Sequence, residues 1–323
     1  MANYLVTGAA GFIGARTSEM LIQDGHTVTG VDNVNAAYDP RMKEYRLKRL
    51  LGMPGFTFYK LDISKKSIID QFKTEKFAGV INLAAWAGVR ASVKNPWIYV
   101  DSNMTGTLNM LELCRQTGAR KFITASTSSI YGLNPPYPTP ESASSSEPLQ
   151  PYAASKKGAE AMAHAYHHLH NIDVTILRFF TVYGPAGRPD LSIFRFVQWI
   201  TEGRPVKVNG DGEQSRGFTY IDDIARGIIL ALKPVGFEIV NLGGHEVITI
   251  NGLIKLIEDV VGKKANVQYG PPNLADMRSN WADVSKARTL LGWEPQYNMR
   301  AGIEELVKWY NAEQEWAREV LTQ

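Results

Sequence analysis

The sequence predicts an α/β fold in which a doubly wound parallel sheet of the Rossmann type is joined to a second, smaller α/β lobe. Short apolar segments alternate with longer amphipathic ones over residues 4–177, and a glycine-rich turn at Gly8, Gly11 and Gly14 follows the first apolar segment. Such alternation is typical of right-handed βαβ units that build a parallel sheet. After about position 178 the pattern loosens into Gly and Pro punctuation, which indicates the second lobe.

The helices and strands of this fold are expected where the period of apolar residues changes. We expect strands at 4–6, 27–31, 56–61, 80–83, 121–125 and 174–177, and helices at 12–23, 65–73, 97–117, 152–170, 253–261 and 301–310. Residues 134–150 contain five prolines and four serines, so we expect an extended surface loop there. We assign residues 1–178 and about 213–242 to the sheet domain, and about 179–212 and 243–323 to the second lobe.

The overall composition argues against several classes of protein. Of the 323 residues, 44% are hydrophobic and 21% are charged, which is the balance of a globular protein. A net charge of +3 is too small to indicate a nucleic-acid partner, so we expect a small-molecule ligand. No apolar run reaches the ~20 residues of a membrane span, and the first strand begins too early for a signal peptide. With Cys114 as the single cysteine, we expect a cytoplasmic protein without internal disulfides.

The glycine-rich turn predicts a dinucleotide site. Gly8, Gly11 and Gly14 lie between the first strand and the first helix, where backbone without a Cβ can approach a pyrophosphate at a helix N-terminus. Asp32 ends the second strand, where a carboxylate can accept hydrogen bonds from the adenosine ribose and repel a 2′-phosphate, so NAD is favoured over NADP. Asp62 could reach the adenine amino group in the same way. The alternatives are glycines used only for a tight turn and an ordinary turn aspartate beside Asn33.

Tyr152 and Lys156 predict redox chemistry on an alcohol. Left alone, a phenol has a pKa near ~10 and cannot take a proton from a sugar hydroxyl at neutral pH. At a spacing of i,i+4 the two side chains share a helix face, so the ammonium can stabilise the phenolate. A lowering by about three pKa units requires on the order of 4 kcal/mol, and a positively charged nicotinamide would contribute to it.

Several motifs together give the chain a resemblance to a known superfamily. These are Thr-Gly-Ala-Ala-Gly-Phe-Ile-Gly at 7–14, Asn-Leu-Ala-Ala at 82–85, four Ser/Thr residues at 126–129 before Tyr131-Gly132, and Tyr152 with Lys156. The chain resembles the extended short-chain dehydrogenase/reductases, in the NAD-dependent epimerase/dehydratase family. Ala-Gly-Val-Arg at 87–90, Arg-Phe-Phe-Thr-Val-Tyr-Gly-Pro at 178–185 and Gly-Arg-Pro-Asp at 187–190 look most like UDP-glucuronate 4-epimerases.

The resemblance implies a tightly held NAD, a UDP-sugar substrate bound by the second lobe, and homodimers packed through the helices near 97–117 and 152–170. It makes Tyr152 the base, Lys156 the residue that tunes it and holds the nicotinamide ribose, and Thr127 the hydroxyl that bonds the substrate O4. Further NAD contacts are expected at Phe12, Ile13, Asn33, Ile63, Leu83, Ala84 and Ala85. Substrate contacts are expected at Arg90, Ser128, Ser129, Thr181, Arg188, Arg216, Asp276 and Arg278.

Two positions depart from the pattern of the resembling family. Gly217 stands where relatives commonly have an aspartate after the arginine, so a contact or local rigidity is expected to be missing. Asn273 stands where an arginine often precedes the position of Asp276, and Arg278 is expected to replace it.

The implied reaction is oxidation of the sugar at C4 to a 4-keto intermediate, followed by return of the hydride to the opposite face. Related 4,6-dehydratases and decarboxylases need an extra acid or base next to the catalytic threonine, where this chain has Ser128 and Ser129. These hydroxyls could instead restrain the sugar carboxylate against loss of CO2. UDP-glucose 4-epimerase and a non-catalytic NAD-sensing module remain the alternatives.

Two groups of residues are not assigned to the site. His164 and His168 have the i,i+4 spacing of a metal pair, but histidines are favoured near a helix C-terminus in any case, and no metal is expected. The basic residues Arg41, Lys43, Arg46, Lys48 and Arg49 are interpreted as a solvated helical face. A role for that segment as a lid near the adenosine is a weaker interpretation.

Overall fold

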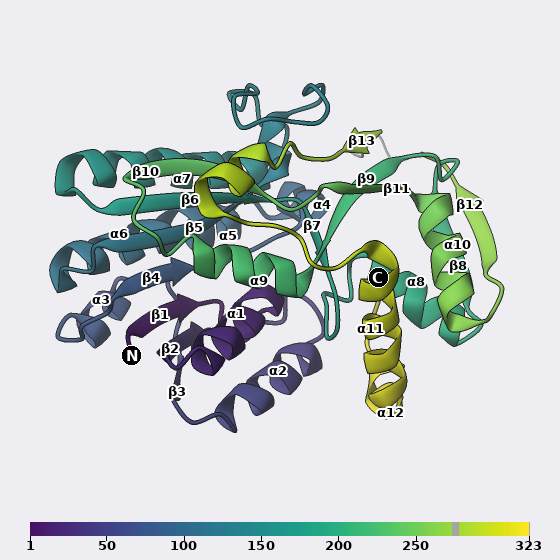
Figure 1. Ribbon diagram of the computed structural model, residues 1–323, viewed down its shortest axis with the longest axis horizontal. Coiled ribbons are helices and arrows are strands. Elements are labelled where there is room, and N and C mark those ends of the chain that lie inside the picture. Colours follow the sequence, from purple (N-terminus) through teal and green to yellow (C-terminus); the bar gives the residue numbers. More distant parts are fainter. Residues whose placement is uncertain (273–277, 323) are drawn as a thin grey trace.

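A parallel sheet forms the centre of the molecule. The computed structural model describes residues 1–272 and 278–322, and within them seven strands lie in the order β10, β6, β5, β4, β1, β2, β3 (Figure 1). They are β1 Asn3–Thr7, β2 Thr27–Asp32, β3 Phe56–Lys60, β4 Gly79–Asn82, β5 Lys121–Thr127, β6 Asp173–Phe179 and β10 Phe237–Leu242. The order reverses between β1 and β4, so the carboxyl ends of these strands flank the crevice where such sheets bind ligands.

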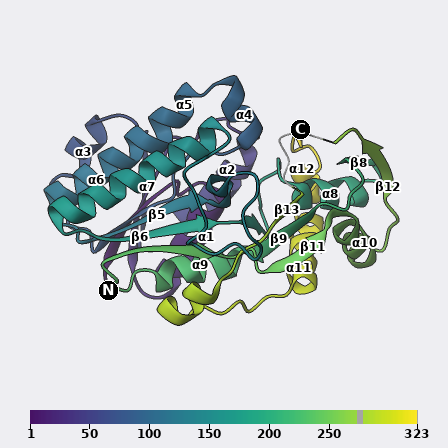
Figure 2. The ribbon, with the colours of Figure 1, turned by 90° about the horizontal axis from the view of Figure 1, so that it is seen from above.

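Helices cover both faces of the sheet. On one face lie α1 Phe12–Gln23, α2 Arg41–Leu51 and α9 Ile221–Leu230, and on the other lie α3 Ser67–Phe72, α6 Gly106–Thr117 and α7 Pro151–His170. Figure 2 shows α3, α6 and α7 together on one side of the sheet, with α9 on the opposite side. Each face buries its own apolar cluster, since a parallel sheet has no face for water. The predicted doubly wound α/β fold is confirmed.

The strands and helices of the sheet domain begin and end close to the expected residues. The helix expected at 97–117 is continuous but changes its winding, from α5 Trp97–Tyr99 through a π-helical turn, η1 Val100–Thr105, into α6. A short α4, Val89–Lys94, precedes it, and a 3-10 turn, η2 Ser128–Tyr131, follows β5. The expected loop at 134–150 contains no helix or named strand.

The remaining segments form a smaller body at the carboxyl end of the sheet, on the right in Figure 1. One small sheet contains β7 Thr181–Tyr183, β9 Ser215–Tyr220, β11 Glu246–Thr249 and β13 Ser279–Asn280, and β8 Pro205–Asn209 pairs with β12 Asn266–Gly270. The helices of this body are α8 Ser192–Thr201, α10 Ile250–Val261, α11 Met299–Ala312 and α12 Gln314–Ala317. The short π-helical turn η3, Ala287–Leu291, packs instead against α9 and β10 of the main sheet (Figure 1). Of the returning segment 213–242, β10 joins the main sheet and β9 joins the small one, and the division into two lobes stays a prediction.

Cys114 lies on the inner face of α6, where it is 1% exposed within the apolar cluster of that face. Burial raises the pKa of the Cys114 thiol, so the side chain serves packing and not nucleophilic chemistry. In the part of the chain that the structure describes, none of the helices has the length and apolar character needed to cross a membrane.

Candidate active site

The glycine-rich turn brings backbone close to backbone. Gly8 has a φ of +70°, and a Cβ built on it would lie 2.8 Å from the amide nitrogen of Ala84. A Cβ on Gly14 would lie 2.2 Å from the carbonyl oxygen of Gly8. Only glycine is compatible with these distances, and the turn leads directly into the N-terminus of α1. The free N–H groups there form a cradle suited to a pyrophosphate.

Asp32 is held at the carboxyl end of β2 by several donors. Its carboxylate accepts hydrogen bonds from the amide nitrogens of Ala10 (3.2 Å) and Val34 (2.7 Å), and Lys43 Nζ lies 3.4 Å away. The side chain is 6% exposed, so its orientation is fixed before any ligand arrives. This is the place and the residue type expected for a ribose contact.

Asp62 follows β3 and lies beside Asn33. The amide of Asn33 donates to the Asp62 carboxylate at 3.1 Å, and the backbone of Ser64 donates at 2.8 Å. Burial acts to raise the pKa of Asp62, but the hydrogen bonds from Ser64 and Asn33 hold this pKa below its ordinary value. Asp62 is therefore an anionic hydrogen-bond acceptor at the end of the cavity near Asp32.

The interpretation of the basic segment as a solvated face is wrong for two of its residues. Lys43 and Arg46 are only 5% and 4% exposed. Arg46 lies between Met42 and Leu50 on the inner stripe of α2, a spacing of four residues that the sequence already shows. Its guanidinium donates to the carbonyl oxygens of Ala10, Ala186 and Gly187. Burial of these cations is possible because their polar atoms are satisfied.

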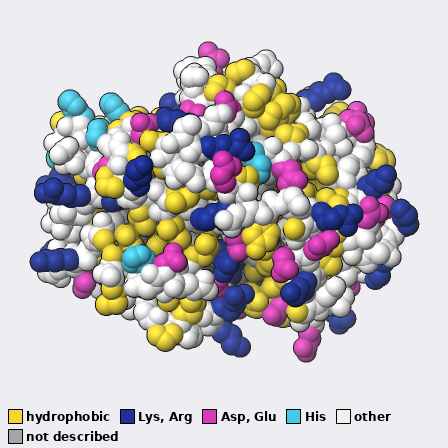
Figure 3. All heavy atoms as spheres, in the orientation of Figure 1, with side chains coloured by type: hydrophobic (Ala, Val, Ile, Leu, Met, Phe, Trp, Pro, Cys, Tyr) yellow, Lys and Arg dark blue, Asp and Glu magenta, His cyan; other side chains and the backbone are white. Residues whose placement is uncertain are grey.

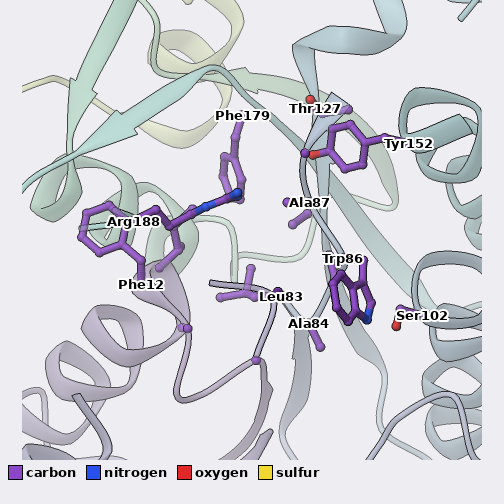
Figure 4. Close-up of a pocket in the computed structure, with 18 of the residues that line it drawn as sticks. Phe12, Leu83, Ala84, Trp86, Ala87, Ser102, Thr127, Tyr152, Phe179 and Arg188 are labelled. Atoms are coloured by element: carbon purple, nitrogen blue, oxygen red, sulfur yellow. The ribbon is translucent and has the colours of Figure 1, made fainter. Parts of the chain in front are cut away.

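Thr127, Tyr152 and Lys156 meet on one wall of a cavity, as Figure 4 shows for the first two. Thr127 ends β5, and its hydroxyl accepts a hydrogen bond from the amide nitrogen of Ser129 at 3.2 Å. Tyr152 and Lys156 lie one turn apart at the start of α7. Lys156 Nζ donates to the carbonyl oxygen of Ala125 at 3.0 Å, which holds the ammonium against β5. The helical spacing therefore brings Tyr152 and Lys156 together, and the packing of α7 against β5 adds Thr127.

The expected lowering of the Tyr152 pKa is not found in the protein alone. Burial raises the pKa of Tyr152, and this outweighs the hydrogen bond with Thr127 and the charge of Arg188, which act to lower it. Burial also lowers the pKa of Lys156 to about 8, although Glu160 acts to raise it. The spacing of Tyr152 and Lys156 alone would lower the pKa of the phenol. Both groups also lose their contact with water on folding, and this loss raises the pKa of Tyr152 and lowers that of Lys156.

A buried ion pair fixes the helix that carries this wall. Arg178 on β6 forms two hydrogen bonds, at 2.9 and 2.8 Å, with the carboxylate of Glu160 on α7. Ser126 donates to the same carboxylate at 2.6 Å. Arg178 and Glu160 are 1% and 4% exposed. Because Glu160 lies one turn after Lys156, this network connects α7 to β5 and β6 directly behind the site.

The cavity has a volume of about 440 Å³ and extends from the glycine-rich turn to β13. Most of the predicted site residues line it: Gly8, Gly11, Phe12, Ile13, Gly14, Asp32, Asn33, Asp62, Ile63, Leu83, Ala84, Ala85, Thr127, Ser128, Ser129, Tyr152, Lys156, Thr181 and Arg188. Arg90, Arg216 and Arg278 lie on α4, on β9 and before β13, outside this lining. Asp276 and Asn273 fall outside the described residues.

Several residues of the lining are not among the predicted site residues. They include Tyr38, Lys43, Trp86, Ser102, Asp190 and Asn280. Asp190 forms two hydrogen bonds with Arg188, at 3.1 and 2.6 Å, and Arg188 reaches across the cavity toward Phe179 (Figure 4). The motif at 187–190 could have indicated Asp190, since it places the two charges two residues apart. No local signal marks Asn280, which enters the cavity from a strand of two residues.

The departure at Gly217 has a packing explanation. A Cβ at this position would lie 2.1 Å from the carbonyl oxygen of Gly244. The turn before β11 therefore packs directly against β9 at this position. Because there is no room for an aspartate, the glycine is required by the fold of this chain.

The histidines of α7 lie away from the cavity. Figure 3 shows histidine side chains gathered at the edge of the molecule where α7 ends, and His164 and His168 are both exposed. Over residues 1–272 and 278–322, no three His, Cys, Asp or Glu side chains are grouped closely enough to hold a metal ion.

A comparison with family models places this geometry in a known group. The model of the NAD dependent epimerase/dehydratase family matches residues 4–243. The chain belongs to this family. A UDP-glucuronate 4-epimerase from Thermodesulfobacterium geofontis is 53% identical over 312 residues, which is 96% of each chain.

Solved structures of the epimerase/dehydratase family have the same fold. The UDP-glucuronic acid 4-epimerase from Bacillus cereus, in complex with UDP-glucuronic acid and NAD, is 34% identical with a TM-score of 0.87, covering 96% of this chain and 99% of that one. The UDP-glucose 4-epimerase from Thermotoga maritima, with UDP-glucose, is 32% identical with a TM-score of 0.90, covering 97% and 99%.

Proposed function

We propose that this protein is a UDP-glucuronate 4-epimerase that uses NAD and interconverts UDP-glucuronate and UDP-galacturonate. The observation that carries the proposal is that one cavity wall contains Thr127, Tyr152 and Lys156 together with two further hydroxyl side chains, Ser128 and Ser129. The 53% identity with a UDP-glucuronate 4-epimerase over 96% of the chain supports the same conclusion.

The residues at the glycine-rich end of the cavity suit NAD. The cradle at Gly8 and Gly14 has no space for a Cβ, the N-terminus of α1 offers N–H donors, and the Asp32 carboxylate is oriented for the ribose hydroxyls. Lys43, which is buried in spite of its place in a basic run, adds a cation beside Asp32. When bound, NAD supplies a positively charged ring and an acceptor for the hydrogen at C4 with its electron pair.

The side chains of this protein then bind the O4 hydroxyl of the sugar and transfer its proton. Tyr152, as the phenolate, accepts the proton of the O4 hydroxyl, while Thr127 donates a hydrogen bond to O4. Burial raises the pKa of Tyr152 in the protein alone, and the charge of Arg188 acts to lower it. The ammonium of Lys156 and the positive ring of bound NAD would add to this lowering. The 4-keto sugar has no stereochemistry at C4, so it yields the epimer if its opposite face is presented before Tyr152 returns the proton.

The charges of the cavity favour epimerisation over dehydration or decarboxylation. Among the described residues, the carboxylates that line the cavity are Asp32 and Asp62 at the adenosine end and Asp190. Although burial acts to raise the pKa of Asp190, its ion pair with Arg188 holds this pKa below the ordinary value. It is therefore an ionised partner of Arg188, and the positions next to Thr127 offer hydroxyls in place of an acid.

We propose that these hydroxyls also protect the substrate. A 4-keto glucuronate loses CO2 when its carboxylate lies perpendicular to the carbonyl plane, and hydrogen bonds from Ser128, Ser129 or Thr181 would hold it in another orientation. Replacing Ser128 and Thr181 by alanine should increase the yield of UDP-pentose. Unchanged product ratios would contradict this role.

The arginines outside the lining are proposed contacts to the UDP part of the substrate. Arg188, which lies in the cavity wall, is a proposed contact of the same kind, whereas Arg90, Arg216 and Arg278 lie on α4, on β9 and before β13. We further propose the division into a sheet domain and a nucleotide-sugar-binding lobe, with the boundaries given above.

A cytoplasmic homodimer is proposed for the assembled enzyme. The helix layer with α4 to α7 (Figure 2) exposes Val93 at 66%, Trp97 at 76% and Leu169 at 67%. We propose that a second copy of the chain covers this layer. A monomeric mass by light scattering would contradict the dimer.

The decisive experiment separates the candidate substrates. The purified protein is incubated with UDP-glucuronate and with UDP-glucose, and the 4-epimers are separated by chromatography. We expect conversion of the uronate and much less of the neutral sugar, with no conversion by a Tyr152→Phe variant. UDP-glucose 4-epimerase is the second candidate because a structure of that activity aligns with a TM-score of 0.90, and preferential conversion of UDP-glucose would favour it.

A non-catalytic NAD-binding module is disfavoured by the joint presence of Thr127, Tyr152 and Lys156 in one wall. Transient absorbance near ~340 nm after addition of a UDP-sugar would indicate catalysis, since it reports reduced cofactor. Its absence, together with no product, would favour the binding module.

A further inference from the structure

Asn280 contacts the wall of the cavity next to the reacting centre. Its side-chain nitrogen donates a hydrogen bond to the hydroxyl oxygen of Ser128 at 3.1 Å, across 152 residues of sequence. Both residues line the cavity, and Ser128 is 5% exposed. Ser128 follows Thr127 directly, so this contact lies at the sugar end of the site.

The direction of this hydrogen bond decides what Ser128 can offer to a ligand. A hydroxyl has one proton and two lone pairs. The Asn280 amide donates to one lone pair of the Ser128 hydroxyl oxygen. The hydroxyl proton of Ser128 therefore does not point to Asn280 and can be donated to another acceptor. Since Ser128 lines the cavity, a ligand bound there can accept this proton. Ser128 is thereby prepared to donate.

A donor distinguishes the two candidate sugars. A carboxylate at C6 only accepts hydrogen bonds, whereas a neutral hydroxymethyl group can accept or donate. A hydrogen bond to a charged acceptor is also stronger than one between neutral groups. An oriented donor at this position therefore favours the uronate more than the neutral sugar.

The strand that carries Asn280 is anchored on both sides. In β13, Ser279 pairs with Ser215 of β9, and beyond Asn280 the carbonyl oxygen of Trp281 accepts a hydrogen bond from the amide nitrogen of Thr139 at 3.0 Å. The rings of Trp281 and Tyr137 stack with their centroids 4.6 Å apart. The loop at 134–150 thus has a role beyond covering the surface: it helps to fix the backbone that presents Asn280.

We propose that Asn280 is a specificity-determining positioning residue, which orients the Ser128 hydroxyl as a donor for an anionic C6 carboxylate of the sugar. This inference rests on the proposed function. Asn280 acts through Ser128 and need not touch the reacting atoms.

The test measures binding selectivity in place of turnover. Dissociation constants of UDP-glucuronate and UDP-glucose are measured by calorimetry on NAD-loaded protein in a Tyr152→Phe background, where the ligand is not consumed. Asn280→Ala should raise the dissociation constant of UDP-glucuronate about tenfold and that of UDP-glucose by less than about twofold. Asn280→Asp, which is nearly the same in shape, should weaken the uronate by roughly a hundredfold, since its carboxylate accepts the Ser128 proton and repels the ligand.

Two controls separate orientation of Ser128 from general damage. Asn266→Ala changes an exposed residue of β12 outside the cavity and should leave both affinities unchanged. In a protein that already carries Ser128→Ala, adding Asn280→Ala should raise the dissociation constant of UDP-glucuronate by less than about twofold, because both changes act through one hydroxyl.

Two results would overturn the inference. One is an equal loss of affinity for both UDP-sugars in Asn280→Ala. The other is a double variant whose loss of affinity for UDP-glucuronate is the product of the losses in Asn280→Ala and Ser128→Ala. Failure of the unmodified enzyme to epimerise UDP-glucuronate would overturn the proposed function, and the turnover assay reports that outcome separately from the binding ratios.

Discussion

Replacing Lys156 by methionine is expected to stabilise the cofactor-free protein while it abolishes activity. Lys156 is 3% exposed, and its pKa is lowered from 10.5 to about 8 by burial. The difference of about 2.5 units corresponds to roughly 3.4 kcal/mol by which the fold disfavours the ammonium relative to the neutral amine. Allowing about 1 kcal/mol for the lost hydrogen bond to Ala125, we expect methionine to raise the free energy of unfolding at pH 7 by about 2 kcal/mol.

The difference in stability between the Lys156→Met variant and the parent should depend on pH in a defined direction. Between about pH 8 and 10.5 the folded lysine is neutral whereas the unfolded lysine is still protonated, so this group makes stability increase with pH in that window. Methionine does not titrate. The stability advantage of Lys156→Met should therefore shrink as the pH rises from 8 to 10.5.

The assay is urea denaturation of both proteins, stripped of nucleotide, at pH 7, 8, 9 and 10. Lys157→Met is the matched control, because the neighbouring lysine has a side chain that is 38% exposed and its replacement should change stability little. A methionine variant less stable than the parent at pH 7, or a difference independent of pH, would refute the reasoning about burial.

Three further predictions concern the cofactor site and the helix behind it. Gly14→Ala places a Cβ 2.2 Å from a backbone oxygen of the glycine-rich turn, so NAD affinity measured by calorimetry should fall at least about tenfold; unchanged affinity would contradict the close packing. Lys43→Met removes the cation 3.4 Å from Asp32 and should raise the dissociation constant of NAD about fivefold, whereas equal affinity would show that this lysine does not support the site. Arg178→Met leaves Glu160 buried without its partner and should lower the free energy of unfolding by about 3–5 kcal/mol in urea; a Glu160→Gln change in the same chain should recover part of the loss, and a single variant as stable as the parent would count against this ion pair.

The sequence by itself determined the parts of this protein that depend on neighbours along the chain. The alternation of apolar segments gives a parallel sheet, and the spacing of Gly8 and Gly14 gives a turn that only glycine can form. Tyr152 and Lys156 share a wall because one helical turn separates them. Such features follow from local geometry, so they could be predicted without knowing what packs against them.

Only the tertiary structure decided which groups lose water and which distant residues meet. Lys43 and Arg46 belong to a basic run that looks solvated, but α2 turns both inward, Lys43 toward the carboxylate of Asp32 and Arg46 toward backbone carbonyl oxygens. The pKa of Tyr152 is raised in the protein alone because burial outweighs its polar neighbours. Asn280 reaches Ser128 across 152 residues, through a two-residue strand that no local pattern marks. Desolvation and long-range contacts are properties of the packed chain, and no spacing along the sequence records them.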